Sequence, residues 1–211
     1  MTSPTPDKRA FVEIREALSF PLSSEAARRD LLVGGTVLWM LPGVGWILNL
    51  GHRLDVVYRI FHGEAPYYRG FAPWGPCFKR GLKAFAAICT YLSPAALCAG
   101  LAYLTSPALY VLSGVFFCLA IYTLPGGMTY NAAYNDISYL YRPDKALKRA
   151  VEGGAAYLWA WCVAILAVTG SALGLLALGV GFFYSSVWAW MVVGYAFSRA
   201  LSLTEQPGAG K

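Results

Sequence analysis

Charged residues are scarce in this sequence and absent from long parts of it. Only 13% of the 211 residues are charged, whereas a soluble domain carries about a quarter. The charge-free runs are Leu31–Gly51, Ala84–Leu104, Leu109–Tyr130 and Ala155–Ser198. A helix needs about 20 apolar residues to cross the hydrocarbon core, and the last run is long enough for two crossings and a turn. The sequence therefore predicts an all-α integral membrane protein.

Catalytic and metal-binding motifs are also missing. The sequence contains no GxSxG, HExxH or Walker motif and no pair of carboxylates in an apolar setting. The five cysteines form no CxxC pair, and His52 and His62 have no obvious ligating partner. We therefore expect no catalytic residue, no cofactor and no metal site. The predicted spans also lack deep ionisable groups, which argues against a proton-coupled transporter.

Basic residues, by contrast, gather in four patches. All 17 Lys and Arg residues lie in Lys8–Arg29, Arg53–Lys83, Arg142–Arg149 and a C-terminal end with Arg199 and Lys211. Lys and Arg concentrate in the cytoplasmic loops of membrane proteins. The net charge of +6 is therefore interpreted as a topology signal, with most charged segments cytoplasmic. Nucleic-acid binding is not expected, because no basic face with readout residues is visible.

Residues 1–30 are expected to form a polar tail and a short amphipathic helix. Phe11, Ile14 and Leu18 recur at helical spacing within Arg9–Phe20, and Pro21 ends the pattern. We predict that this helix is interfacial and lies in the headgroup plane. Packing against the rest of the protein is the alternative, and the sequence does not decide between the two.

The first apolar run, residues 31–51, contains a helix breaker. Pro42 stands beside Gly43 and near Gly45 in its middle. The run is either a kinked transmembrane helix or a re-entrant hairpin that turns at Pro42-Gly43, with a first arm of roughly 16 Å, half the hydrocarbon core. The hairpin places every Lys and Arg on one side of the membrane, whereas a fifth span moves the amino end to the other side. We therefore favour the hairpin.

Residues 52–83 combine basic and aromatic side chains. Pro66, Pro73 and Pro76 argue against a long helix here, and such a composition is typical of the lipid headgroup region. We predict an interfacial loop that contacts anionic headgroups. The residues expected to make these contacts are Arg53, Arg59, Arg69, Trp74, Lys79, Arg80 and Lys83.

Two helical hairpins are predicted to complete a single membrane domain, residues 31–200. The first covers residues 84–130 and the second 155–200, with a polar link at 131–154 and a C-terminal tail at 201–211. Small residues recur at helical spacing in the second hairpin, which favours close packing against the neighbouring span or against a second copy. This helix-packing stripe comprises Gly153, Ala160, Ala164, Ala167, Ser171 and Gly174.

Three stretches of the chain carry a family resemblance. They are Ile14–Pro21, then Gly51–Glu64 leading to Gly81-Leu82-Lys83, and Ala155-Ala156-Tyr157-Leu158 before the last hairpin. Together they resemble a family of prokaryotic multi-pass membrane proteins that is known only as a domain of unknown function. The family's usual Gly-Tyr pair stands here as Gly51-His52. The resemblance implies a prokaryotic plasma (inner) membrane protein, and it carries no established activity or site.

These observations predict a non-enzymatic integral membrane protein that acts as an accessory or scaffold subunit of a larger membrane assembly. The expected partners are membrane lipids with anionic headgroups and other membrane protein subunits. Two alternatives stay open. A transporter or channel component would need a hydrated path, and a lipid-handling membrane enzyme would use the Arg53–Lys83 loop on anionic headgroups.

Overall fold

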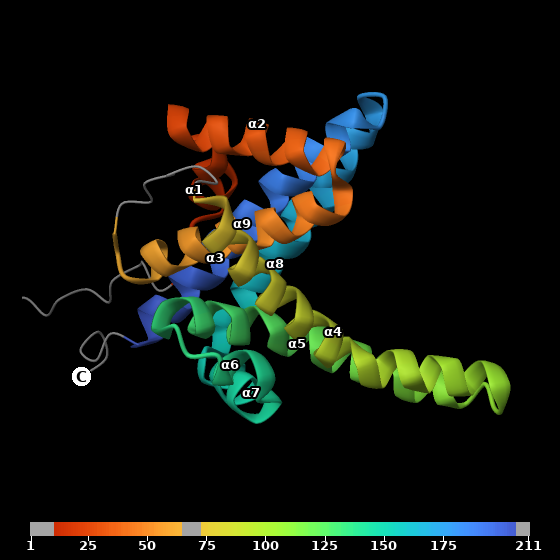
Figure 1. Cartoon of the computed structure of the whole chain (residues 1–211). Coiled ribbons are helices and arrows are strands. Elements are labelled where there is room, and N and C mark those ends of the chain that lie inside the picture. The colour runs from red at the N-terminus through yellow and green to blue at the C-terminus, as the bar shows by residue number, and fades with distance from the viewer. Residues whose placement is uncertain (1–10, 65–72, 206–211) are drawn as a thin grey trace, which may run out of the picture.

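The structure is a bundle of helices joined by short connections. The computed structural model describes residues 11–64 and 73–205, and every regular element in these ranges is helical. The predicted all-α membrane fold is confirmed. In chain order the elements are α1 (Ile14–Ser19), η1 (Phe20–Leu22), α2 (Glu25–Met40), α3 (Pro42–Phe61), α4 (Trp74–Leu104), α5 (Leu109–Tyr134), α6 (Ser138–Tyr141), α7 (Pro143–Glu152), α8 (Gly154–Ser171), η2 (Ala172–Leu176) and α9 (Val180–Glu205) (Figure 1).

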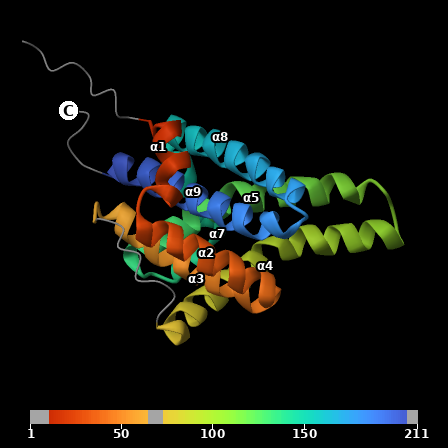
Figure 2. The ribbon, with the colours of Figure 1, turned by 90° about the horizontal axis from the view of Figure 1, so that it is seen from above.

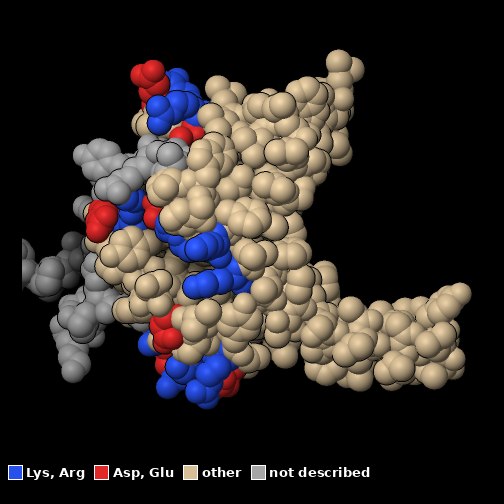
Figure 3. All heavy atoms as spheres, viewed as in Figure 1, with Lys and Arg blue, Asp and Glu red and all other residues tan. Residues whose placement is uncertain are grey.

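Four helical segments are long and apolar enough to cross a membrane. They are α4, α5, α8 continued by η2, and α9, and they form two hairpins. α4 has 31 residues, which makes about 46 Å of helix against a hydrocarbon core of about 30 Å. Figure 3 shows the Lys, Arg, Asp and Glu side chains gathered at one end of the molecule, whereas the hairpin tips at the opposite end show none.

The first apolar run folds back on itself as a hairpin. α2 ends at Met40 and α3 begins at Pro42, whose missing N–H is tolerated in the first turn of a helix. The Asn49 side-chain amide donates to the Gly34 carbonyl across this hairpin, at 3.0 Å. Neither helix is among the four candidate spans, and the hairpin tip points to the same side as the tips of the longer hairpins (Figure 1). The observed form is thus the folded-back one, not a single kinked helix.

The prediction of a loop at residues 52–83 is wrong for most of these residues, which are helical. α3 continues to Phe61, and α4 already begins at Trp74. The prolines do not prevent these helices, because Pro73 is the N-cap of α4 and Pro76 lies in its first turn, where the backbone N–H groups need no helical partner. The described basic residues of this region therefore lie on two helices, Arg53 and Arg59 on α3 and Lys79, Arg80 and Lys83 on α4.

Helix ends also differ from the prediction in the polar link and at the C-terminus. α5 continues to Tyr134, into the predicted polar link, whereas α7 lies within that link and does not change its bounds. α9 continues to Glu205, beyond the predicted boundary at residue 200. α5 stops at Asn135, whose φ of 51° is left-handed, a conformation that Asn tolerates better than most residues.

The N-terminal helix packs on the second hairpin. α1 begins at Ile14 and has six residues. The indole N–H of Trp159 on α8 donates to the Val12 carbonyl at 2.8 Å, and that of Trp188 on α9 donates to the Leu18 carbonyl at 3.1 Å. Of the two placements that the sequence left open, these contacts support packing against the rest of the protein.

α9 lies at the centre of the bundle, in contact with α8, α2, α3 and α5 (Figure 2). Of the apolar 18-residue stretch of α9, 56% is buried inside the protein. The corresponding stretches of the other three candidate spans are 17% to 28% buried. The first hairpin, α4–α5, projects away from this core, and its tip diverges from that of the second hairpin (Figure 1). A hollow is visible between the two projecting arms (Figure 3).

Candidate functional site

The space between the diverging hairpins forms an apolar cleft of about 780 Å³. α4 and α5 line one side, α8 and α9 line the other, and α2 and α3 complete the lining. The strongly polar lining residues are few and come only from α2 and α3. They are Asp30, Asn49, His52 and Arg53.

α3 and α9 each line the cleft with one face of the helix. Lining positions recur every three or four residues along each helix, so they lie on one side of it. The α3 series is Trp46, Leu50, Arg53 and Val57, and the α9 series is Phe183, Val187, Trp190, Gly194 and Phe197.

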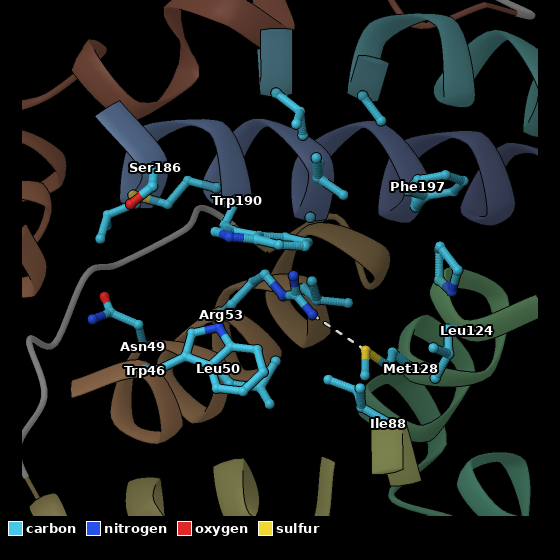
Figure 4. Close-up of a pocket in the computed structure, with 18 of the residues that line it drawn as sticks. Trp46, Asn49, Leu50, Arg53, Ile88, Leu124, Met128, Ser186, Trp190 and Phe197 are labelled. Carbon is cyan, nitrogen blue, oxygen red and sulfur yellow. Dashed lines mark hydrogen bonds between the residues drawn. The ribbon is translucent and has the colours of Figure 1, made fainter. Parts of the chain in front are cut away.

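Arg53 is the one Lys or Arg among the described residues that line the cleft. A guanidinium N–H donates to Met128 Sδ at 3.2 Å, and the group lies over the Trp190 indole, 5.0 Å from the ring centre (Figure 4). None of the ion pairs within residues 11–64 and 73–205 includes Arg53. Burial lowers the pKa of Arg53 to about 10, so the group stays charged at neutral pH. Met128 Sδ is a weak acceptor and engages one nitrogen, so most of the guanidinium donors have no hydrogen-bond partner among the described residues.

A close crossing of α3 and α4 determines where Arg53 lies along the cleft. A Cβ on Gly81 would fall 1.8 Å from the Ile47 carbonyl oxygen, and a Cβ on Gly51 would fall 2.0 Å from that of Cys77. Glycine permits this approach of two backbones because it has no Cβ. Arg53 follows directly after the crossing on α3, at the level of the basic first turns of α4. It therefore lies at the charged end of the cleft.

Asp30 and His52 form a buried pair next to Arg53, between α2 and α3. His52 Nε2 lies 2.9 Å from Asp30 Oδ2, and the two side chains are 8% and 1% exposed. Asp30 Oδ1 has no hydrogen-bond partner within the described part of the chain. No ligating partner for His52 was predicted from the sequence. The hairpin alternative nevertheless contained the signal, because Asp30 and His52 are equally far from Leu41 at the turn.

The residues predicted to contact lipid headgroups occupy different settings. Arg53 lies in the cleft, whereas Arg59 and Arg80 lie 3.5 and 2.6 Å from Asp55 carboxylate oxygens. Burial opposes ionisation of Asp55, but the two guanidinium groups outweigh it and hold the pKa of this carboxyl below its usual value. Exposed positions near the start of α4 are taken by Trp74, Lys79 and Lys83. Arg69 lies outside the described residues, and headgroup contact stays a prediction for all of them.

The small-residue stripe lies where α8 and η2 meet α9. Ala160 and Ala167 are fully buried, and a Cβ on Gly174 would fall 2.1 Å from Ser185 Oγ of α9. Gly153, directly before α8, is close to Leu201 of the same helix α9. Buried positions of the stripe are Gly153, Ala160, Ala164, Ala167 and Ser171, and Gly174 is partly exposed. All these contacts are within one chain.

Neither the titratable side chains of the described residues nor comparisons with known proteins indicate a function. Within residues 11–64 and 73–205, His, Cys, Asp and Glu side chains form no group of three that could hold a metal ion. No protein-family model, curated protein or solved structure matches this chain. The resemblance to an uncharacterised prokaryotic family therefore stays a prediction, and the cleft is the main evidence on function.

Proposed function

We propose that this protein is a non-enzymatic integral membrane protein that holds a membrane lipid in the cleft between its two hairpins. The observation that supports this function is the cleft itself, about 780 Å³ in volume, with apolar walls and one polar end. Ligand sites of about 300–1,000 Å³ are commonly lined by apolar side chains with a few polar groups that orient the ligand.

The distribution of polar groups favours an amphiphile over a uniformly polar or apolar ligand. Along the hairpins the walls offer apolar side chains such as Ile88, Phe117, Ile121 and Ile165, which suit an acyl chain. At the opposite end Arg53 offers a charge. Because the cleft lies between two arms that diverge (Figure 3), a lipid could enter it sideways from the bilayer without crossing water.

The other functions expected from the sequence suit the cleft less well. As an accessory subunit, the protein would receive a transmembrane helix of its partner there. An apolar helix would leave the charge of Arg53 uncompensated, which is strongly unfavourable. A transporter would need a hydrated path, whereas the walls toward the hairpin tips are apolar. A headgroup-modifying enzyme would need catalytic groups at the polar end, and only Asp30 and His52 are titratable neighbours of Arg53 there.

The membrane location belongs to the same proposal. We place the charged end of the molecule at the cytoplasmic face of a prokaryotic plasma membrane, because Lys and Arg are retained on that side. Cysteines introduced at Lys148 and at Ser106, in a background without the native cysteines, test this placement. A membrane-impermeant thiol reagent added to intact cells should label the cysteine at position 106 and not the one at position 148, and the reverse pattern would refute the orientation.

Filling the cleft tests lipid binding directly. Ile121→Trp adds bulk to a cleft wall, whereas Val115→Trp adds the same bulk to an exposed position of the same helix that does not line the cleft. Lipid retained per chain after extensive detergent washing is counted by native mass spectrometry. We expect retention by the wild type and by Val115→Trp and loss by Ile121→Trp. Equal retention by all three, or a stoichiometric protein partner in place of lipid, would refute the function.

A further inference from the structure

We propose that the lipid in the cleft has an anionic phosphate headgroup and that Arg53 binds this phosphate. The inference rests on the proposed lipid-binding function. It adds the chemical class of the ligand and names the residue that selects it. Arg53 is then a specificity determinant of the cleft, not one of several cationic side chains on an interfacial loop.

The first support is a charge that no carboxylate of the described residues compensates by an ion pair. Arg53 lies among Met128, Trp190 and apolar neighbours, and no ion pair of the described residues includes it. A charge removed from water is strongly unfavourable unless an opposite charge and hydrogen bonds replace the water. The neighbouring carboxylate, Asp30, is engaged with His52. An anion that enters the cleft would supply the opposite charge and the hydrogen-bond acceptors that the described residues do not give Arg53.

The second support is the way the guanidinium is held. A Cβ on Gly194 would fall 3.1 Å from Arg53 Cγ, so the aliphatic stem lies directly against α9. Trp190 covers the guanidinium, and Met128 accepts from one nitrogen (Figure 4). Because packing fixes the stem and the plane, the remaining N–H groups form a rigid fork. A planar fork of this kind matches the paired oxygens of a phosphate group.

The third support is the depth of Arg53. The Gly51–Gly81 crossing places it at the level of the first turns of α4, where Trp74, Lys79 and Lys83 are exposed. Trp and Lys are typical of the headgroup zone, and basic side chains there concentrate anionic lipids. A phosphate bound to Arg53 would thus stay at headgroup depth while its acyl chains extend along the apolar walls toward the hairpin tips. This match favours a phospholipid of the surrounding leaflet over a soluble phosphate.

Headgroup competition tests the assignment. The full chain, reconstituted with equal amounts of phosphatidylglycerol and phosphatidylcholine of identical acyl chains, is extracted in neutral detergent. The retained lipids are counted by native mass spectrometry. We expect the wild type to prefer phosphatidylglycerol, and Arg53→Gln to reduce that preference by about tenfold to a hundredfold, the effect of losing one charge-assisted hydrogen bond. Arg53→Lys should retain part of the preference, because it keeps the charge but not the fork.

Controls separate this inference from the function on which it rests. Lys148→Gln removes an exposed charge on α7 that does not line the cleft, and it should leave the preference unchanged. If Arg53→Gln still retains lipid but equally for both headgroups, both proposals stand. If it keeps the full wild-type preference, the headgroup inference is wrong while lipid binding stands. If the wild type retains oleate in preference to phosphatidylglycerol, the phosphate assignment is wrong. If Ile121→Trp retains as much lipid as the wild type, the function itself fails.

Thermal melting gives a second readout that does not depend on extraction. A ligand that binds only the folded protein raises its melting temperature as its concentration increases. Added phosphatidylglycerol should therefore raise the melting temperature of the wild type and of Lys148→Gln more than that of Arg53→Gln. An equal increase in all three variants would overturn the role of Arg53.

Discussion

The two hairpins are alike in apolar character and differ in how much of their surface the protein covers. The most apolar windows of α8 and α9 are 28% and 56% buried, whereas those of α4 and α5 are 22% and 17% buried. The second hairpin is covered by the N-terminal segment and by α2 and α3. Large side chains near the tip of the first hairpin are exposed, namely Leu97, Leu101, Leu104, Val111 and Val115.

This difference shows that the hairpins are positioned by different forces. Protein contacts hold the second hairpin along its length. The first is held mainly near its charged end, by the glycine crossing, by contacts of α5 with α3 and α7, and by the Tyr157 hydroxyl. The bilayer must cover the rest. The width of the cleft therefore depends on a few contacts near the charged end of α4 and α5.

The largest effect is expected at the glycine crossing. Gly81→Ala places a Cβ 1.8 Å from a backbone oxygen of α3, and backbone cannot move aside as a flexible side chain can, so we expect a loss of about 3 kcal/mol. Gly100→Ala on the same helix meets nothing within 4 Å and should stabilise by about 0.5–1 kcal/mol. Melting in mild detergent compares the two. Similar melting temperatures would mean that the crossing does not hold the first hairpin.

The packed hairpin should be less tolerant of added bulk than the exposed one. Ala167 is fully buried against α9, whereas Ala96 on α4 is exposed. We expect Ala167→Leu to destabilise by about 1–3 kcal/mol, the usual effect of overpacking a core. Ala96→Leu should change stability little. If the melting temperatures of both variants equal that of the wild type, the small-residue stripe does not pack as described.

The Tyr157 hydroxyl bonds the second hairpin to the backbone of the first, and its loss should have a moderate effect. Tyr157 of α8 donates to the Tyr122 carbonyl at 2.5 Å and accepts from the Gly126 N–H at 3.2 Å. In an uninterrupted helix these two backbone groups of α5 would bond each other, so the hydroxyl is inserted beside Pro125, where kinks form. We expect Tyr157→Phe to destabilise by about 1–2 kcal/mol.

The same variant should also change the angle between the hairpins. Spin labels at the two tips, with distances measured by pulsed electron paramagnetic resonance, would report this change. Tyr110→Phe, at an exposed position of α5, is the matched control and should change neither the distance nor the stability. An unchanged tip distance in Tyr157→Phe would show that the hydroxyl does not set the angle.

The smallest effect is expected from the charged link between α3 and α4. The pKa of Asp55 is lowered in the folded protein, so its ionised form stabilises the fold at pH values above its unfolded pKa. This stabilisation is lost as the pH falls through the folded value, below about pH 4. Because Arg80 is partly exposed, we expect Asp55→Asn to destabilise by less than about 1 kcal/mol at pH 7. A difference from the wild type that persists in acid would contradict this explanation.

The spans could be predicted from the sequence, whereas most of the cleft could not. Charge-free runs of sufficient length are visible without any knowledge of packing, and Pro42 indicates the turn of the folded-back hairpin. The prediction of a loop at residues 52–83 failed because the prolines were interpreted as helix breakers, although Pro73 and Pro76 stand at the start of α4. The Asp30–His52 pair depends on the folded-back hairpin, which brings two residues 22 positions apart into contact.

By itself, the sequence determined which segments are helical enough and apolar enough to cross a membrane, because the unfavourable transfer of charge into lipid is a property of each segment alone. Only the tertiary structure decided that one face of α3 turns Arg53 between the hairpins. That orientation follows from contacts between residues far apart in the chain, above all Gly51 with the backbone at Cys77 and the Arg53 stem with Gly194. No local pattern encodes which faces of two helices will meet.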